Sequence, residues 1–100
     1  MNKWKPFYVA GVQFHELDKV IDKLTTESYL NLVEEHDNKY DPYAVAIYFD
    51  HVQVGYVPKT ISHEVSNALY DYFLECKVIK VNKEAKPWNR LFVEIVEVEG

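Results

Sequence analysis

The segment His36–Tyr43 (HDNKYDPY) gathers the side chains that are best suited to chemistry in this chain. It combines carboxylates and an amide, which exchange hydrogen bonds, with aromatic rings and a proline. Asp and Asn bond their own backbone and proline presets φ, so this composition predicts a turn. Asn38 and Asp41 therefore have a structural role first, and that role can coexist with binding. Tyr40 suits packing over its own turn and stacking on a ligand equally well.

Short strands with two helices between them must position this turn. Hydrophobic alternation and helical spacing predict these elements. The expected strands are Phe7–Phe14, Tyr29–Val33, Ala44–Phe49, Val52–Val57, Cys76–Val81 and Leu91–Val98, and the expected helices are Leu17–Thr25 and 62–74. Asp50 and His51 make residues 44–57 a hairpin, and Thr60 or Ser62 is expected to cap the second helix.

Many short strands with two helices indicate a mainly β (α+β) fold, as a small barrel or curled sheet. One core is expected, because 100 residues make one domain. The apolar faces assign to it Val9, Leu32, Val45, Ile47, Val54, Leu69, Val78 and Val93.

Composition narrows the function classes. A single cysteine, Cys76, excludes an internal disulfide framework and a multi-thiolate zinc site. No apolar run approaches the roughly 18 residues of a membrane span, and the N-terminus lacks a signal-peptide core, so a cytoplasmic protein is expected. The net charge is −5, yet residues 77–90 carry +4 and the rest −9. Net charge alone therefore does not exclude a nucleic-acid ligand.

Three separated motifs carry a resemblance. They are Val9-Ala10-Gly11-Val12-Gln13-Phe14-His15, Asn38-Lys39-Tyr40-Asp41-Pro42-Tyr43-Ala44-Val45-Ala46-Ile47, and Val54-Gly55-Tyr56-Val57-Pro58-Lys59 followed by a helix. Together they resemble the HIRAN domain, a module found in some DNA-repair helicases and alone in bacteria, and this chain resembles the stand-alone type. The resemblance covers about residues 7–98, within a single domain of residues 1–100.

The resemblance implies an OB-like barrel of about six strands with two helices. It also implies binding of single-stranded DNA, with preference for a free 3′-hydroxyl end, in DNA repair or replication. In that picture Phe14 and Tyr40 stack on bases, and Asn38 and Asp41 make polar contacts, Asp41 with the terminal hydroxyl. Lys59 contacts a phosphate, and Trp88 adds an apolar wall.

Two positions depart from the family pattern, and both disfavour phosphate binding. Gln13 stands where the family often has Arg, and Asp37 where it often has Asn. The alternative function is therefore a protein-interaction module with the same fold that has lost DNA binding. Without the resemblance, each of the following also has a purely structural interpretation. Phe14 is then expected in the core, and Lys59 is expected to be a solvated surface residue. Residues 77–90 are expected to form a solvated hairpin tip.

Catalysis and metal binding have weaker support in the sequence. A metal-dependent nuclease would have to use the acids of residues 34–41, whose spacing matches no standard metal motif. His15-Glu16 and His63-Glu64 are adjacent pairs that point apart, so neither forms a dyad. Cys76 is expected to be a buried apolar residue. We therefore expect no enzyme activity and no cofactor.

Overall fold

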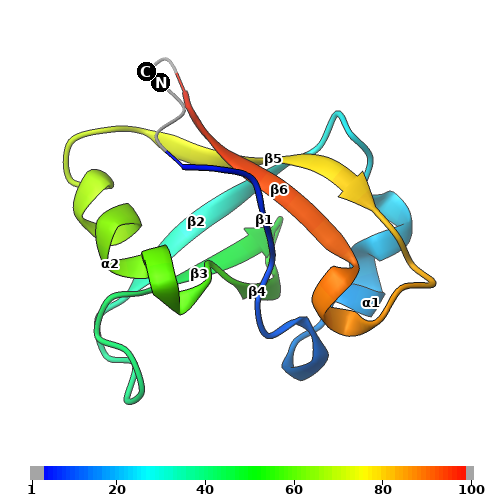
Figure 1. The fold of residues 1–100 in the computed structure, drawn as a ribbon, viewed down its shortest axis with the longest axis horizontal. Coiled ribbons are helices and arrows are strands. Elements are labelled where there is room, and N and C mark those ends of the chain that lie inside the picture. The colour runs from blue at the N-terminus through cyan, green and yellow to red at the C-terminus, as the bar shows by residue number, and fades with distance from the viewer. Residues whose placement is uncertain (1–3, 99–100) are drawn as a thin grey trace.

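The protein folds around one curled antiparallel sheet in a computed structural model that describes residues 4–98 (Figure 1). The strands lie in the order β1-β6-β5-β2-β3-β4. They are β1 (Phe7–Tyr8), β2 (Tyr29–Glu35), β3 (Ala44–Phe49), β4 (Val52–Tyr56), β5 (Leu74–Val81) and β6 (Leu91–Glu97). The α-helices are α1 (Leu17–Val20) and α2 (Lys59–Ala68), and the 3-10 turns are η1 (Val12–Phe14), η2 (Ile21–Lys23) and η3 (Pro87–Asn89).

The segment after β1 links the two edges of the sheet. The Val9 N–H donates to the Leu91 carbonyl at 2.9 Å. Ala10 and Tyr56 exchange backbone hydrogen bonds of 2.9 and 2.8 Å, which connect the same segment to β4. Register shifts at Ile47/Tyr48 and at Val78/Lys80 add the local bends that let a sheet curl. The predicted small OB-like α+β fold with six strands is confirmed.

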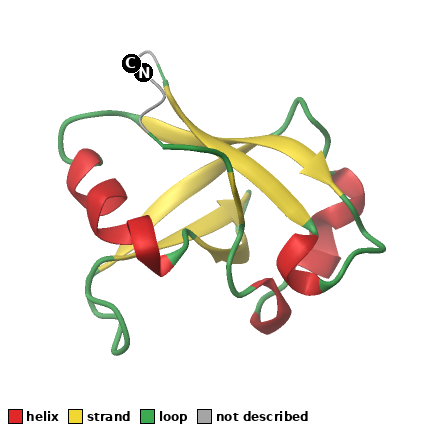
Figure 2. Ribbon diagram, viewed as in Figure 1, coloured by secondary structure: helices red, strands yellow, loops and turns green. Residues whose placement is uncertain are grey.

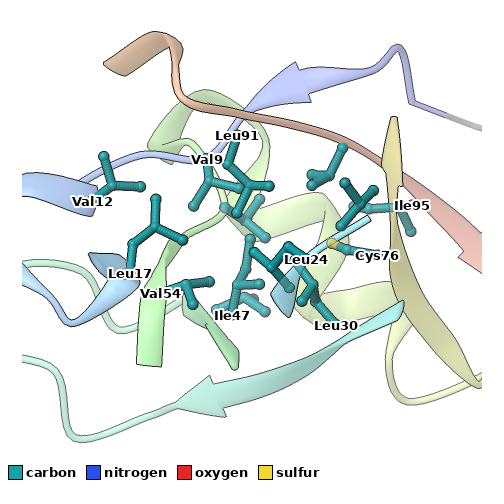
Figure 3. Packing of buried hydrophobic residues seen from close by; sticks show 14 of the residues in the cluster. Val9, Val12, Leu17, Leu24, Leu30, Ile47, Val54, Cys76, Leu91 and Ile95 are labelled. Carbon is teal, nitrogen blue, oxygen red and sulfur yellow. The ribbon is translucent and has the colours of Figure 1, made fainter. Parts of the chain in front are cut away.

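The core lies inside the curl of the sheet, where apolar side chains from all parts of the chain point toward one another (Figure 3). Six of the eight expected core residues are fully buried, and Leu32 and Leu69 pack against them from partly buried positions. Helix α2 and helix α1 lie at opposite ends of the sheet (Figure 2). Within residues 4–98, no helix has the length and apolar character needed to cross a bilayer.

The predicted hairpin is confirmed, with Phe49 paired to Val52 across a two-residue turn. Asp50 takes a left-handed φ of 55° in that turn. Two-residue hairpin turns require positive φ, and Asp tolerates it better than most residues because its short side chain can hydrogen-bond locally.

The strand expected over Phe7–Phe14 is wrong in extent. Strand β1 ends at Tyr8, because Gly11 adopts a φ of 70° and starts the 3-10 turn η1. A left-handed residue breaks the alternation of faces, so Phe14 leaves the core side and is 79% exposed. The prediction that Phe14 lies in the core is therefore wrong as well.

The expected helix boundaries also differ. Helix α2 begins at Lys59 and ends at Ala68, instead of covering 62–74, and neither Thr60 nor Ser62 caps it. Aromatic residues after Leu69 favour helix weakly, and residues 69–73 form turns against the helix end. The first helix is likewise shorter than Leu17–Thr25, as it changes from α1 to the 3-10 turn η2.

Candidate nucleic-acid interface

A hollow of about 200 Å³ lies between the 36–43 loop and the segment that follows β1. We call it the Tyr56 groove. It is lined by Ala10, Gly11, Asn38, Asp41, Ala44, Tyr56, Val57 and Lys59. Three of the lining residues are Ala or Gly, and their small side chains leave the room. In Figure 1 the loop is at the lower left, and the blue segment is at the lower centre.

Hydrogen bonds of Asx type hold the 36–43 loop in shape. The Asn38 Oδ1 accepts from the backbone N–H groups of Tyr40 at 2.9 Å and Asp41 at 3.0 Å. The Asp41 Oδ1 accepts from the N–H of Tyr43 at 2.9 Å. The predicted turn-building role of Asn38 and Asp41 is thus confirmed. The turn presents Tyr40 to solvent, with 86% of the residue exposed.

Helix α2 fastens the loop at the rim of the groove. The Ser62 hydroxyl donates to Asp41 Oδ2 at 2.8 Å and also approaches the Lys59 carbonyl at 3.3 Å. The Lys59 ammonium donates to the Tyr40 carbonyl at 3.4 Å, a long contact at an exposed position. Since Ser62 is buried, its bond to the carboxylate fixes Asp41 relative to the helix.

Glu35 joins the floor of the groove to the loop, a role that the sequence did not reveal. Its Oε1 accepts from the Tyr56 hydroxyl at 2.6 Å and from Asn38 Nδ2 at 3.1 Å. Burial raises the pKa of Tyr56, and its hydrogen bond to the Glu35 carboxylate raises that pKa further. Tyr56 is part of the third sequence motif, but only the fold shows that its ring lines the groove.

Phe14 and Trp88 are not among the residues that line the groove. Phe14 follows Gly11 by three positions, at the end of η1, and η1 lies against η3, which carries Trp88. Trp88 is 56% exposed, and the Lys86 ammonium lies 5.6 Å from the centre of its ring. The structure thus brings Asn38, Asp41 and Lys59 into one groove, with Tyr40 on its loop. It does not bring Phe14 and Trp88 into that groove.

The basic segment 77–90 is partly neutralised within the molecule. Lys83 pairs with Asp22 at 3.0 Å, and Arg90 pairs with Asp18 at 2.7 Å. The hairpin tip expected over 77–90 is shorter in the structure, because β5 continues to Val81 and the connection covers only residues 82–90. Among the residues that the structure describes, one cation, Lys59, lines the groove, and Lys39 lies on the 36–43 loop. Both lysines are exposed.

Among residues 4–98, no three or more His, Cys, Asp or Glu side chains are placed to hold an ion together.

Cys76 is fully buried, as expected, and burial raises the pKa of its thiol well above the usual range.

The sequence was compared with protein-family models and curated proteins, and the structure with solved structures. The family model of the HIRAN domain matches residues 6–98. A crystal structure of a protein from Lactobacillus plantarum has a TM-score of 0.81 at 16% identity, covering 94% of this chain and 91% of that one. The crystal structure of the HIRAN domain of human HLTF has a TM-score of 0.64 at 15% identity, covering 91% and 69%. The search among curated proteins found no match.

At such low identity the two structures show a shared fold, whereas the family model spans nearly the whole chain. HIRAN domains are in general nucleic-acid-binding modules and not catalytic ones. The three motifs that carried the resemblance meet in this fold around the Tyr56 groove, and the chain belongs to the HIRAN family.

Proposed function

We propose that this protein binds single-stranded DNA and holds a free 3′ end in the Tyr56 groove. The observation that carries the proposal is the meeting of Asn38, Asp41 and Lys59 in one hollow, although they come from a loop and a distant helix. Turn building alone requires no such convergence. Recognition of free 3′ ends suits a role in DNA repair or replication, with residues 1–100 acting as one domain.

The chemistry of Asp41 favours a strand end over the middle of a strand. A carboxylate has about four lone-pair sites, and the structure uses two of them, for the Tyr43 N–H and the Ser62 hydroxyl. The remaining capacity can accept a bond from a terminal 3′-hydroxyl. A phosphate at the same place would meet a like charge, which is unfavourable.

The other residues supply contacts that do not depend on the end group. Tyr40, on the 36–43 loop, and Phe14, in η1, are highly exposed rings, and each base stacked on such a ring is worth about 1–3 kcal/mol. Lys39 and Lys59 can hold the phosphates of the preceding nucleotides. Trp88 lies farther along, beside the turn of Phe14, and can support a further base.

The test compares one labelled oligonucleotide that ends in a 3′-hydroxyl with the same strand carrying a 3′-phosphate, at low salt. The hydroxyl strand is expected to bind about ten-fold tighter or more, since a hydrogen bond to a charged group contributes about 1.5–3 kcal/mol. Blocking the 5′ end should change little. Equal affinity for the two strands, or no binding to either, would contradict the proposal.

Three variants assign the roles. Asp41→Asn should shrink the difference between the two strands, because an amide does not repel phosphate. Tyr40→Ala should weaken both strands alike, since stacking does not sense the end group. Tyr70→Ala serves as the matched control: it removes another highly exposed tyrosine, two residues beyond the far end of α2, and it should leave both affinities unchanged.

A further inference from the structure

A second group of exposed aromatic residues follows helix α2. Tyr70 is 71% exposed and Phe73 is 72% exposed, and Tyr72 between them is also exposed. Two hollows, of about 280 and 380 Å³, adjoin this segment and share Tyr72 and Leu74 in their walls. We call the segment and the two hollows the α2–β5 surface. Three exposed aromatic residues within four positions are unusual on a surface that contacts only water.

The α2–β5 surface is preformed. The Tyr72 N–H donates to the Ala68 carbonyl at 2.9 Å, and the Val98 N–H donates to the Phe73 carbonyl at 2.7 Å. The segment is thereby tied at one end to the helix and at the other to the residue that follows β6. Leu69 and Leu74 pack against the core beneath it. A partner would therefore meet a surface that needs little ordering, which lowers the cost of binding.

The charge around this surface is negative. Glu64 and Asp71 line the first hollow, and Glu75 lines the second. Among the described residues that line the two hollows, none is Lys or Arg. The C-terminal end of α2, at Ala68, adds the partial negative charge of the helix dipole. Charge complementarity therefore calls for a cationic occupant that also has apolar side chains.

We propose that the α2–β5 surface is a docking site for a segment of a partner protein that carries apolar residues flanked by Lys or Arg. The apolar residues would enter the two hollows beside Tyr72 and Phe73, and the cations would face Asp71 and Glu75. Nucleic acid does not fit this surface, because its phosphates would meet the same acids. A symmetric dimer would likewise place Asp71 and Glu75 of one protomer against those of the other.

This docking site does not depend on the proposed DNA binding. The Tyr56 groove adjoins the first residue of α2, Lys59, whereas the α2–β5 surface includes the second half of the helix, from Glu64, and the residues that follow it. The helix has 10 residues, so its ends are about 15 Å apart. Figure 1 shows the two regions on opposite sides of the helix, with the 36–43 loop below it and the start of β5 above. Both sites can be occupied at once.

The test is selection of a displayed library of short random peptides on the full chain. Selected peptides are expected to share apolar residues flanked by Lys or Arg. Their synthetic versions should lose affinity about 30-fold on the Phe73→Ser variant, as expected for a hot-spot residue. A comparable loss is expected on Asp71→Lys, which reverses a charge at the rim. Both positions are exposed, and thermal unfolding of each variant would establish that it is folded.

The matched control is Tyr40→Ala, which removes an exposed aromatic residue at the other site and should bind the peptides like the unchanged protein. The proposal is overturned if no peptide is selected, if the selected peptides lack basic residues, or if they bind the Phe73→Ser variant unchanged. It is also overturned if the protein alone forms dimers in sedimentation that Phe73→Ser dissolves, because a second copy would then be the occupant.

Discussion

At the scale of single residues, the groove depends on carboxylates that act within the protein as well as toward a ligand. Glu35 accepts hydrogen bonds from Tyr56 and Asn38, and Asp41 accepts from Ser62 and Tyr43. These bonds fix the 36–43 loop internally and connect it to β4 and to α2, so the acids shape the site before any ligand arrives. This double use explains why acidic residues are tolerated beside a proposed DNA site.

Removing the Ser62 hydroxyl should loosen this arrangement. Ser62→Ala deletes the 2.8 Å bond to Asp41 at a buried position, and hydrogen bonds to charged groups contribute about 1.5–3 kcal/mol. Since alanine favours helix slightly more than serine does, we expect a net loss of about 1–2 kcal/mol in the free energy of unfolding. Urea denaturation measures it. Thr60→Ala, an exposed change in the same helix, is the control, and equal stability of the two variants would contradict the expected role.

Tyr56 should titrate above its ordinary pKa of 10.0, because burial and the Glu35 hydrogen bond favour the protonated hydroxyl. The folded state binds this proton more tightly than the unfolded state. The resulting stability is therefore complete below pH 10 and is lost as the pH rises through the folded-state pKa. Alkaline titration of tyrosinate absorbance in the near ultraviolet should show that Tyr56→Phe removes a step above pH 10. If the step removed lies at or below pH 10, the Tyr56–Glu35 bond does not hold the proton.

At the scale of elements, closure of the sheet depends on Gly55. A Cβ there would lie 2.5 Å from the Ala10 carbonyl oxygen and 2.5 Å from Val9 Cγ1. Gly55→Ala should therefore push residues 9 and 10 away from β4 and cost about 1–3 kcal/mol. Gly11→Ala has space, with its nearest neighbours at 3.8 Å, and should cost about 1–2 kcal/mol through its left-handed φ alone.

Amide hydrogen exchange separates these two variants. Faster exchange at Ala10 and Tyr56, whose N–H groups make the closing bonds, is expected in Gly55→Ala beyond the general loss of stability. Gly11→Ala should show the general loss without that local effect. Unchanged protection of both amides in Gly55→Ala would mean that the closure tolerates a side chain at this position.

The sequence predicted the regular elements well and their ends poorly. The hairpin at 44–57 was predicted from a continuous apolar run and a two-residue turn, and β5 and β6 were predicted from their apolar residues; the structure has all of these elements. The strand through Phe14 was wrong because Gly11 adopts a positive φ and starts a 3-10 turn, which the alternation of apolar residues does not reveal. In the site, Asn38 and Asp41 were predictable from turn chemistry. Glu35 was not, because its partner Tyr56 lies 21 residues away.

At the scale of the whole molecule, the single cysteine reports on the intact core. Cys76 lies in β5 and is fully buried, and burial raises its thiol pKa well above the usual range. Because the thiolate is the reactive form, the native protein at mildly alkaline pH should react with a thiol reagent far more slowly than the urea-unfolded chain. Val54→Ala, which opens a cavity in the same core, should speed the labelling. Equal rates for native and unfolded protein would contradict a sealed core.

The distribution of charge over the whole molecule limits how strongly salt can affect DNA binding. The net charge is −5, and two of the basic residues in 77–90 are paired with Asp18 and Asp22. Lys59 lines the groove and Lys39 lies on the 36–43 loop that forms one of its walls, so these two are the cations expected to contact phosphate there. For single strands, the slope of log affinity against log salt is about −0.7 for each phosphate neutralised, so a slope of about −1.4 is expected.

A salt titration of the wild type and two variants tests whether Lys39 and Lys59 produce this salt dependence. Lys59→Gln should reduce its magnitude by about 0.7, because one phosphate contact is lost. Lys23→Gln changes an exposed lysine on η2, which directly follows α1, and should leave the slope unchanged. Figure 1 shows α1 on the opposite side of the fold from the 36–43 loop. A steep slope that Lys23→Gln reduces as much as Lys59→Gln does would assign the binding to diffuse charge on the molecule, and the groove would no longer be the site.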